Sequence, residues 1–149
     1  IVLDGLAEIP PTSRILGDEA STIIVVTEDA PAERVQAFRD RNAEIVVSGH
    51  GKYVDLPSML PELRHRFGIE RLLVEGGGTV HRSMIAADLY DEIQLIICPF
   101  VIGGSNSITP VGRRAFWPQG TVPKFRLDRS EVIGDYLYVI YKPEDAPSG

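Results

Sequence analysis

The sequence predicts an α/β fold, with a mostly parallel central sheet flanked by helices and an antiparallel hairpin towards the C-terminus. Three observations support this prediction. Short apolar runs rich in β-branched residues alternate with amphipathic helical patterns in the first part of the chain. The inner runs are almost continuously apolar, which is typical of strands covered on both faces of a parallel sheet. Two strand patterns near the C-terminus are separated by a short turn, which is typical of a hairpin.

The first part of the chain supplies the expected parallel sheet and its helices. A first helix is expected over Pro31–Arg41 and a second over Leu56–Phe67, where Pro61 must lie near the helix start or kink it. A third helix is expected to follow Gly78. The expected strands of the sheet are Ile1–Asp4, Thr22–Thr27, Glu44–Ser48 and Arg71–Val74.

The character of the sequence changes after the third helix. Glu92–Phe100 has the pattern of a strong strand. Residues 102–120 are rich in Gly, Ser, Asn and Pro and predict a long loop, which carries Phe116 and Trp117. We expect Phe125–Val132 and Tyr136–Tyr141 to pair as the antiparallel hairpin.

Length and composition restrict the class of protein. A length of 149 residues is enough for one ordinary domain, and we expect residues 1–149 to form a single one. Hydrophobic residues make up 44% of the chain and charged residues 24%, which argues against intrinsic disorder. The net charge of −6 argues against nucleic acid or an anionic membrane as the main partner. No apolar run is long enough to cross a bilayer, and we expect a cytoplasmic protein.

The residue types that bind metals are sparse. The single cysteine, Cys98, excludes an internal disulfide or a cysteine-rich zinc site within these residues. The three histidines, His50, His65 and His81, share no metal-ligand spacing. The sequence therefore predicts no metal site.

The strongest candidate for a binding site is a glycine-rich segment between an apolar run and a helical pattern. Three glycines, Gly76, Gly77 and Gly78, precede Thr79 and Val80. Glycines allow a tight turn and a close approach of backbone N–H groups to a ligand, and the following helix directs its positive end to the same place. This combination suits a phosphate. The alternative is that the glycines only permit close packing between helix and strand.

Glu75 is the strongest single candidate for a ligand-binding residue in this region. It directly follows three apolar residues, at the expected carboxyl end of a strand, where open α/β sheets bind their ligands. The alternative is an ion-paired carboxylate at the rim of the sheet. His81 is of interest because it falls in the first turn of the helix that follows the glycines.

Several segments with these features together resemble one known family. They are Leu72–Thr79, Leu89–Ile93, Pro99–Gly104, and Val2–Gly5 followed by Ile9–Pro11 and Ser13–Leu16. They resemble the riboflavin-biosynthesis reductases, which include the C-terminal reductase domains of bifunctional deaminase–reductases and their stand-alone relatives. The resemblance implies a dihydrofolate-reductase-like fold and reduction of the ribosyl group of a pyrimidinone 5′-phosphate to ribityl by hydride transfer. It also implies NADPH as cofactor and a homodimer.

The resemblance implies a role for individual residues. Glu75 matches a glutamate that contacts the small-molecule substrate. Gly5 stands where relatives often carry serine beside the adenosine 2′-phosphate, and Val54 falls on a segment near the adenine. The cofactor loop of the family falls on Gly76, Gly77, Gly78, Thr79, Val80 and His81.

The largest departure from the family lies at the front of the chain. Relatives have a considerable N-terminal stretch before the Val-Leu-Asp block, and it completes their cofactor and substrate pockets. The main hypothesis is therefore an NADPH-dependent reductase represented by a partial chain. One alternative is a dinucleotide-binding or dimerisation module without catalysis. Another is a reductase of the same fold that acts on a different pterin or pyrimidine.

Overall fold

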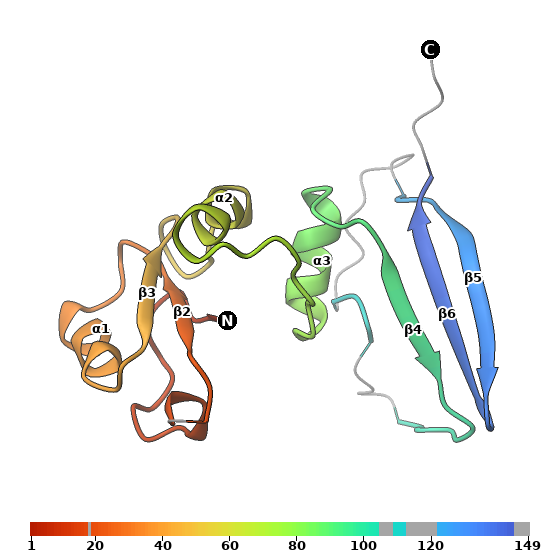
Figure 1. The fold of residues 1–149 in the computed structure, drawn as a ribbon, viewed down its shortest axis with the longest axis horizontal. Coiled ribbons are helices and arrows are strands. Elements are labelled where there is room, and N and C mark those ends of the chain that lie inside the picture. Colours follow the sequence, from red (N-terminus) through yellow and green to blue (C-terminus); the bar gives the residue numbers. More distant parts are fainter. Residues whose placement is uncertain (18, 105–108, 113–121, 145–149) are drawn as a thin grey trace, which may run out of the picture. The chain divides into compact units, whose positions relative to one another are not determined.

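The computed structural model describes residues 1–17, 19–104, 109–112 and 122–144 (Figure 1). The chain divides into two compact units, Ile1–Leu73 and Val74–Gly149. Phe116 and Trp117, which the sequence places on the long loop, lie outside the described residues. Within the described part of the chain, no helix is both long and apolar enough to cross a membrane.

The first unit is built on a parallel sheet of three short strands. These are β1 (Val2–Leu3), β2 (Ile23–Val26) and β3 (Glu44–Val47), in the order β1-β2-β3. β1 pairs with β2 in parallel, and β2 pairs with β3 in parallel. The predicted parallel arrangement of this part of the chain is confirmed. The central position of β2 explains why all four of its residues are buried.

Two helices enclose this sheet. α1 (Ala32–Arg39) buries Phe38 in a core cluster with the sheet residues Ile24 and Ile45. α2 (Leu56–Phe67) has the predicted bounds, and its buried stripe consists of Leu56, Met59 and Leu63. The two helices lie on either side of β3 (Figure 1). A short 3-10 helix, Arg14–Leu16, adds Leu16 to the core cluster.

The prediction of a strand over Arg71–Val74 is wrong. The described residues of this segment belong to no sheet, and Leu73 is 72% exposed. The run has the local composition of a strand, but a strand forms only where a neighbouring strand accepts its backbone hydrogen bonds. The segment instead joins the two units, and Glu75 does not follow a strand.

The second unit is built on an antiparallel sheet. It begins with α3 (Gly78–Ala86) and continues with β4 (Ile93–Ile97), β5 (Phe125–Ile133) and β6 (Tyr136–Pro143). The strand order is β4-β6-β5. The predicted hairpin is confirmed because β5 and β6 pair directly across a turn. Gly134 in this turn has a φ of +61°, a left-handed conformation that glycine adopts without strain.

Candidate functional site

The glycine turn of the second unit ends at the amino terminus of α3. Gly77 is the residue that caps the helix, and α3 starts at Gly78. The N–H groups of Gly78 and Thr79 have no hydrogen-bond acceptor among the described residues. Free N–H groups and the positive end of the helix dipole make this turn suitable for an anion such as a phosphate.

The three glycines differ in the space that the structure leaves for a Cβ atom. A Cβ atom on Gly76 would lie 2.8 Å from the Cβ of Val80, and one on Gly78 would lie 2.7 Å from the backbone N of Gly112. These two glycines are therefore needed for close packing. A Cβ on Gly77 would meet no atom of the described residues within 4 Å, so the space beside Gly77 is open in the part of the chain that the structure describes. None of the three lies in the left-handed region of φ.

His81 supports the turn from the first turn of α3. Its Nδ1 lies 2.9 Å from the carbonyl oxygen of Pro110, and its Nε2 lies 3.3 Å from that of Val74. A neutral imidazole donates one of these hydrogen bonds, and the protonated ring donates both. Gly112 N donates a further bond of 2.8 Å to the carbonyl of Gly78. The residues from Thr109 to Gly112 are thus held against the start of α3.

Glu75 lies immediately before this turn and is exposed. The alternative of an ion-paired carboxylate finds no support, since no ion pair of Glu75 exists within the described ranges. An exposed carboxylate without a cationic partner is available to accept hydrogen bonds from hydroxyl or amino groups of a ligand. Its role in substrate binding remains a prediction.

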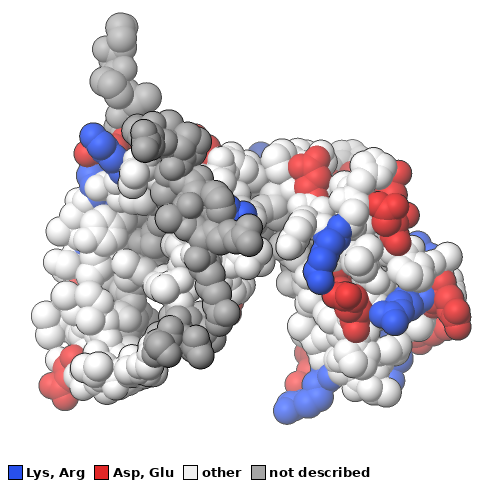
Figure 2. All heavy atoms as spheres, turned by 180° about the vertical axis from the view of Figure 1, so that it is seen from behind, with Lys and Arg blue, Asp and Glu red and all other residues white. Residues whose placement is uncertain are grey.

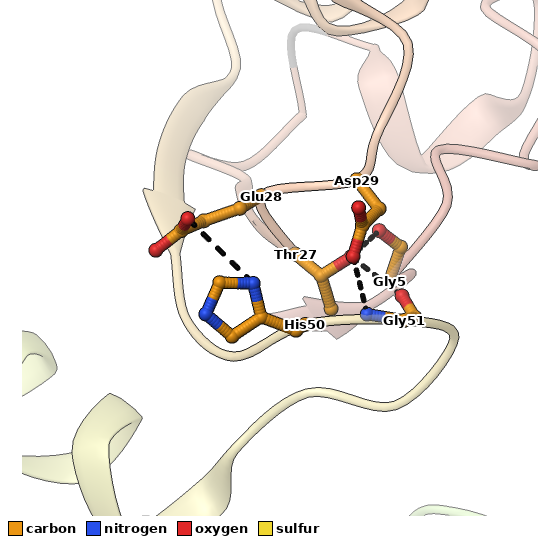
Figure 3. Close-up of polar contacts among 6 residues, drawn as sticks. All are labelled: Gly5, Thr27, Glu28, Asp29, His50 and Gly51. Carbon is orange, nitrogen blue, oxygen red and sulfur yellow. Dashed lines mark hydrogen bonds and ion pairs between the residues drawn. The ribbon is translucent and has the colours of Figure 1, made fainter.

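A second group of polar residues lies where the parallel strands of the first unit end. We call Gly5, Thr27, Glu28, Asp29, His50 and Gly51 the strand-end cluster (Figure 3). Thr27 Oγ1 lies 2.9 Å from the carbonyl oxygen of Gly5 and 2.7 Å from that of Gly51. The Asp29 carboxylate accepts a hydrogen bond from Gly51 N–H. These bonds tie the segments that follow β1, β2 and β3 to one another.

Gly5 is fixed by its contact with the segment that follows β3. A Cβ atom at Gly5 would lie 2.1 Å from the carbonyl oxygen of Lys52, which leaves no room for any side chain. Val54 belongs to the same segment. The two ends of this segment are joined by a hydrogen bond of 2.7 Å, which Ser48 Oγ donates to the carbonyl oxygen of Asp55. The structure therefore brings Gly5 and the segment of Val54 together in the first unit. Glu75 and the glycine turn belong to the second unit.

Thr27 and Asp29, which organise the strand-end cluster, were not among the functional residues predicted from the sequence. The signal was available, because Thr27 directly follows the four buried residues of β2, just as Glu75 follows a run of three apolar residues. Asp4 was also missed. Its buried carboxylate accepts hydrogen bonds of 2.8 Å from the N–H groups of Glu8 and Ile9, so it shapes the turn after β1.

Comparison with known proteins identifies the family. The family model described as the RibD C-terminal domain matches residues 1–139. The chain belongs to this family. The resemblance to riboflavin-biosynthesis reductases is thereby confirmed, and the RibD C-terminal domain accounts for nearly the whole chain.

Two relatives with this domain are named as the same enzyme. The chain is 42% identical over 141 residues to the 2,5-diamino-6-ribosylamino-4(3H)-pyrimidinone 5′-phosphate reductase of Methanothermobacter thermautotrophicus, covering 95% of the chain and 64% of that protein. It is 39% identical over 135 residues to the reductase of the same name from Archaeoglobus fulgidus, covering 91% and 58%. The chain thus spans less than two thirds of the length of these relatives.

Solved structures support the fold. A pyrimidine reductase-like protein from Corynebacterium diphtheriae superimposes with a TM-score of 0.74 at 17% identity, over 97% of this chain and 60% of that one. RibD from Acinetobacter baumannii gives a TM-score of 0.74 at 20% identity, over 95% and 36%. The RibD C-terminal domain described here therefore has the expected dihydrofolate-reductase-like α/β fold.

Proposed function

We propose that this chain is part of a reductase that converts 2,5-diamino-6-ribosylamino-4(3H)-pyrimidinone 5′-phosphate into its ribitylamino product. The reaction adds one hydride and one proton, so the ribosyl group is reduced to ribityl. A reduced nicotinamide dinucleotide, when bound, supplies the hydride. The proposal is supported by family membership and by two relatives named for this substrate.

The observation that carries the proposal is the glycine turn at the start of α3. Among the described residues, its N–H groups find no acceptor and the space at Gly77 is open, which fits a dinucleotide pyrophosphate that needs close backbone donors. In this proposal Gly76 and Gly78 give the turn its shape, and Gly77 and Thr79 face the pyrophosphate. Val80 packs beneath the turn, and His81 holds it in place.

The remaining site residues have complementary roles in the proposal. Glu75 accepts hydrogen bonds from the substrate and orients it for reduction. Gly5 and Val54, at the ends of the parallel strands, hold the adenosine end of the dinucleotide. NADPH is the dinucleotide that the family resemblance implies.

We also propose that the protein is a cytoplasmic homodimer. One face of the β4-β6-β5 sheet is apolar, and the register places Ile97, Leu137 and Val132 side by side on it. All three are exposed, and Val132 is 73% exposed. Light scattering of the full-length protein should show a dimer. Val132→Lys should shift it to a monomer if this face forms the interface.

Turnover by the full-length protein tests the proposed reaction. The protein is mixed with the pyrimidinone 5′-phosphate and NADPH or NADH, and loss of nicotinamide absorbance is followed together with the mass of the product. We expect a product heavier by two hydrogens, formed in proportion to the dinucleotide oxidised. Binding of dinucleotide without this product would overturn the proposed substrate, and failure of both dinucleotides to bind would overturn the proposed reductase.

A further inference from the structure

The strand-end cluster determines what the adenosine end of a bound dinucleotide meets. NADH and NADPH share the nicotinamide and the pyrophosphate and differ in one group, the phosphate on the 2′-oxygen of the adenosine ribose. A site distinguishes them through the charges and hydrogen-bond donors that surround this group. A side-chain hydroxyl at position 5 would be such a donor.

This chain cannot offer a donor side chain at position 5. The carbonyl oxygen of Lys52 occupies the position that a Cβ on Gly5 would need. This carbonyl is held there because Gly51 is bonded both to Thr27 and to Asp29 (Figure 3). The group that closes the site at Gly5 is therefore a hydrogen-bond acceptor, which cannot donate to a phosphate.

The charged side chains in and beside the strand-end cluster are mainly acidic. Glu28 and Asp29 directly follow Thr27, and Glu8 lies across from Lys52. The two basic groups close to them already face carboxylates. Lys52 Nζ lies 3.6 Å from Glu8 Oε2, and His50 Nδ1 lies 3.6 Å from Glu28 Oε2.

Two further charges belong to the same neighbourhood. The buried carboxylate of Asp4 lies beside Gly5, and Arg34 Nη1 donates a 3.1 Å hydrogen bond to the carbonyl of Ala7. The charged groups around the site are thus four carboxylates against one lysine and one arginine, with His50 in addition. On the face of this unit seen in Figure 2, Lys and Arg are likewise interspersed with Asp and Glu.

From this arrangement we infer that the adenosine end of the site selects a ribose with a free 2′-hydroxyl, so the protein binds NADH more tightly than NADPH. A hydroxyl donates a hydrogen bond to a carboxylate, as in dinucleotide sites where an acidic residue after a strand binds the ribose. A 2′-phosphate would bring up to two negative charges close to Glu28 and Asp29. The inference rests on the proposed dinucleotide function of this chain.

Calorimetric titration of the full-length protein tests the selectivity without catalysis. The four probes are NADH, NADPH, and the fragments 5′-AMP and adenosine 2′,5′-bisphosphate, which carry the adenosine end alone. We expect each 2′-phosphorylated probe to bind about fivefold or more weakly than its partner, as repulsion across roughly 8 Å of solvated surface implies. The difference should narrow as salt is raised, because salt screens repulsion between exposed charges.

Charge variants show whether the carboxylates cause the selectivity. The double variant Glu8→Gln/Glu28→Gln releases Lys52 and His50 from their partners, and it should raise affinity for adenosine 2′,5′-bisphosphate roughly fivefold while leaving 5′-AMP within about twofold. Glu70→Gln is the matched control, because Glu70 is likewise an exposed glutamate that pairs with a basic side chain, that of Arg64. It should change neither affinity.

The outcomes separate this inference from the proposed function. If NADPH binds as tightly as NADH or more tightly, or if the double variant leaves the ratio unchanged, the inference is overturned and the reductase proposal stands. If neither dinucleotide nor either fragment binds, the reductase proposal fails together with it.

Discussion

The two units of the chain bury their apolar residues to very different degrees. In the first unit, Ile24, Val25, Val46 and Phe38 have no accessible surface. In the second unit, apolar strand residues such as Ile96 and Val132 are largely exposed. The described atoms of the second unit in Figure 2 also show few charged residues. The first unit closes a core of its own, and the second presents apolar surface.

Connectivity explains this difference. Parallel strands need long crossover connections, and in the first unit the connection between β2 and β3 forms α1. α2 follows β3, and both helices pack against the sheet. The antiparallel strands β5 and β6 are joined by a short turn, which brings no covering helix. The hairpin of the second unit therefore leaves more apolar sheet surface exposed.

Truncation of a core residue gives the largest expected effect. Phe38→Ala should lower the free energy of unfolding by about 3–5 kcal/mol, because the side chain is fully buried between α1 and the parallel sheet. Val132→Ala in the second unit should change it by less than about 0.5 kcal/mol in a monomeric sample. Denaturant unfolding measures both. Similar losses for the two variants would contradict the difference between the units.

The glycine turn provides the next largest effect and concerns binding. Gly77→Val should weaken dinucleotide binding about tenfold or more, because a branched side chain fills the open space and keeps the backbone N–H groups from the phosphates. The free energy of unfolding of this variant should fall by about 1 kcal/mol at most, since valine is a poor helix-capping residue. Gly78→Ala is the contrasting variant, and it should lower the melting temperature because its Cβ meets Gly112. If the folded Gly77→Val variant binds the dinucleotide with unchanged affinity, the glycine turn serves packing and not binding.

Glu75→Gln tests where substrate recognition lies. The amide keeps the size of the side chain and one acceptor oxygen but loses the charge. Loss of one charge-assisted hydrogen bond is worth about 1.5–3 kcal/mol, so kcat/KM of the full-length protein should fall roughly ten- to hundredfold. Dinucleotide affinity and melting temperature should stay the same. A wild-type kcat/KM would remove Glu75 from the site.

The smallest expected effect is on how the stability of the second unit changes at alkaline pH. Burial, with a smaller contribution from Asp88, raises the pKa of Tyr90. The folded protein therefore favours the neutral phenol, and this stabilisation is complete below the unfolded pKa of about 10 and is lost as pH rises through the folded value. Tyr90→Phe keeps the ring contact with Phe125 and should lose less stability between about pH 9 and 11. Parallel losses in both proteins would assign the pH dependence elsewhere.

Local patterns in the sequence predicted most elements correctly. The helix Leu56–Phe67 was predicted with its observed bounds, since its apolar stripe has helical spacing. The structure shows that Gly68 ends this helix in a left-handed conformation. The hairpin was predicted because its turn carries Gly134. The strand predicted at Arg71–Val74 was wrong because an apolar run cannot show whether a pairing partner exists.

The candidate site shows the same limit. The sequence located Gly5 and the three glycines, but it did not distinguish glycines required by packing from the one beside open space. That distinction depends on Gly112 and Lys52, which are distant in the sequence from Gly78 and Gly5. Thr27 and Asp29 acquire their roles only because three parallel strands end together.

The sequence by itself determined the α/β class, the helices, the hairpin and the family, because spacing, glycine positions and short motifs are local properties of the chain. Tertiary structure decided which apolar runs become strands and which carboxylates face which cations. It also decided at which glycines backbone atoms of a distant segment leave no room for a Cβ. Those outcomes depend on contacts between segments separated by tens of residues. Backbone pairing, steric exclusion and charge proximity are set by distance in space, and no local pattern encodes that distance.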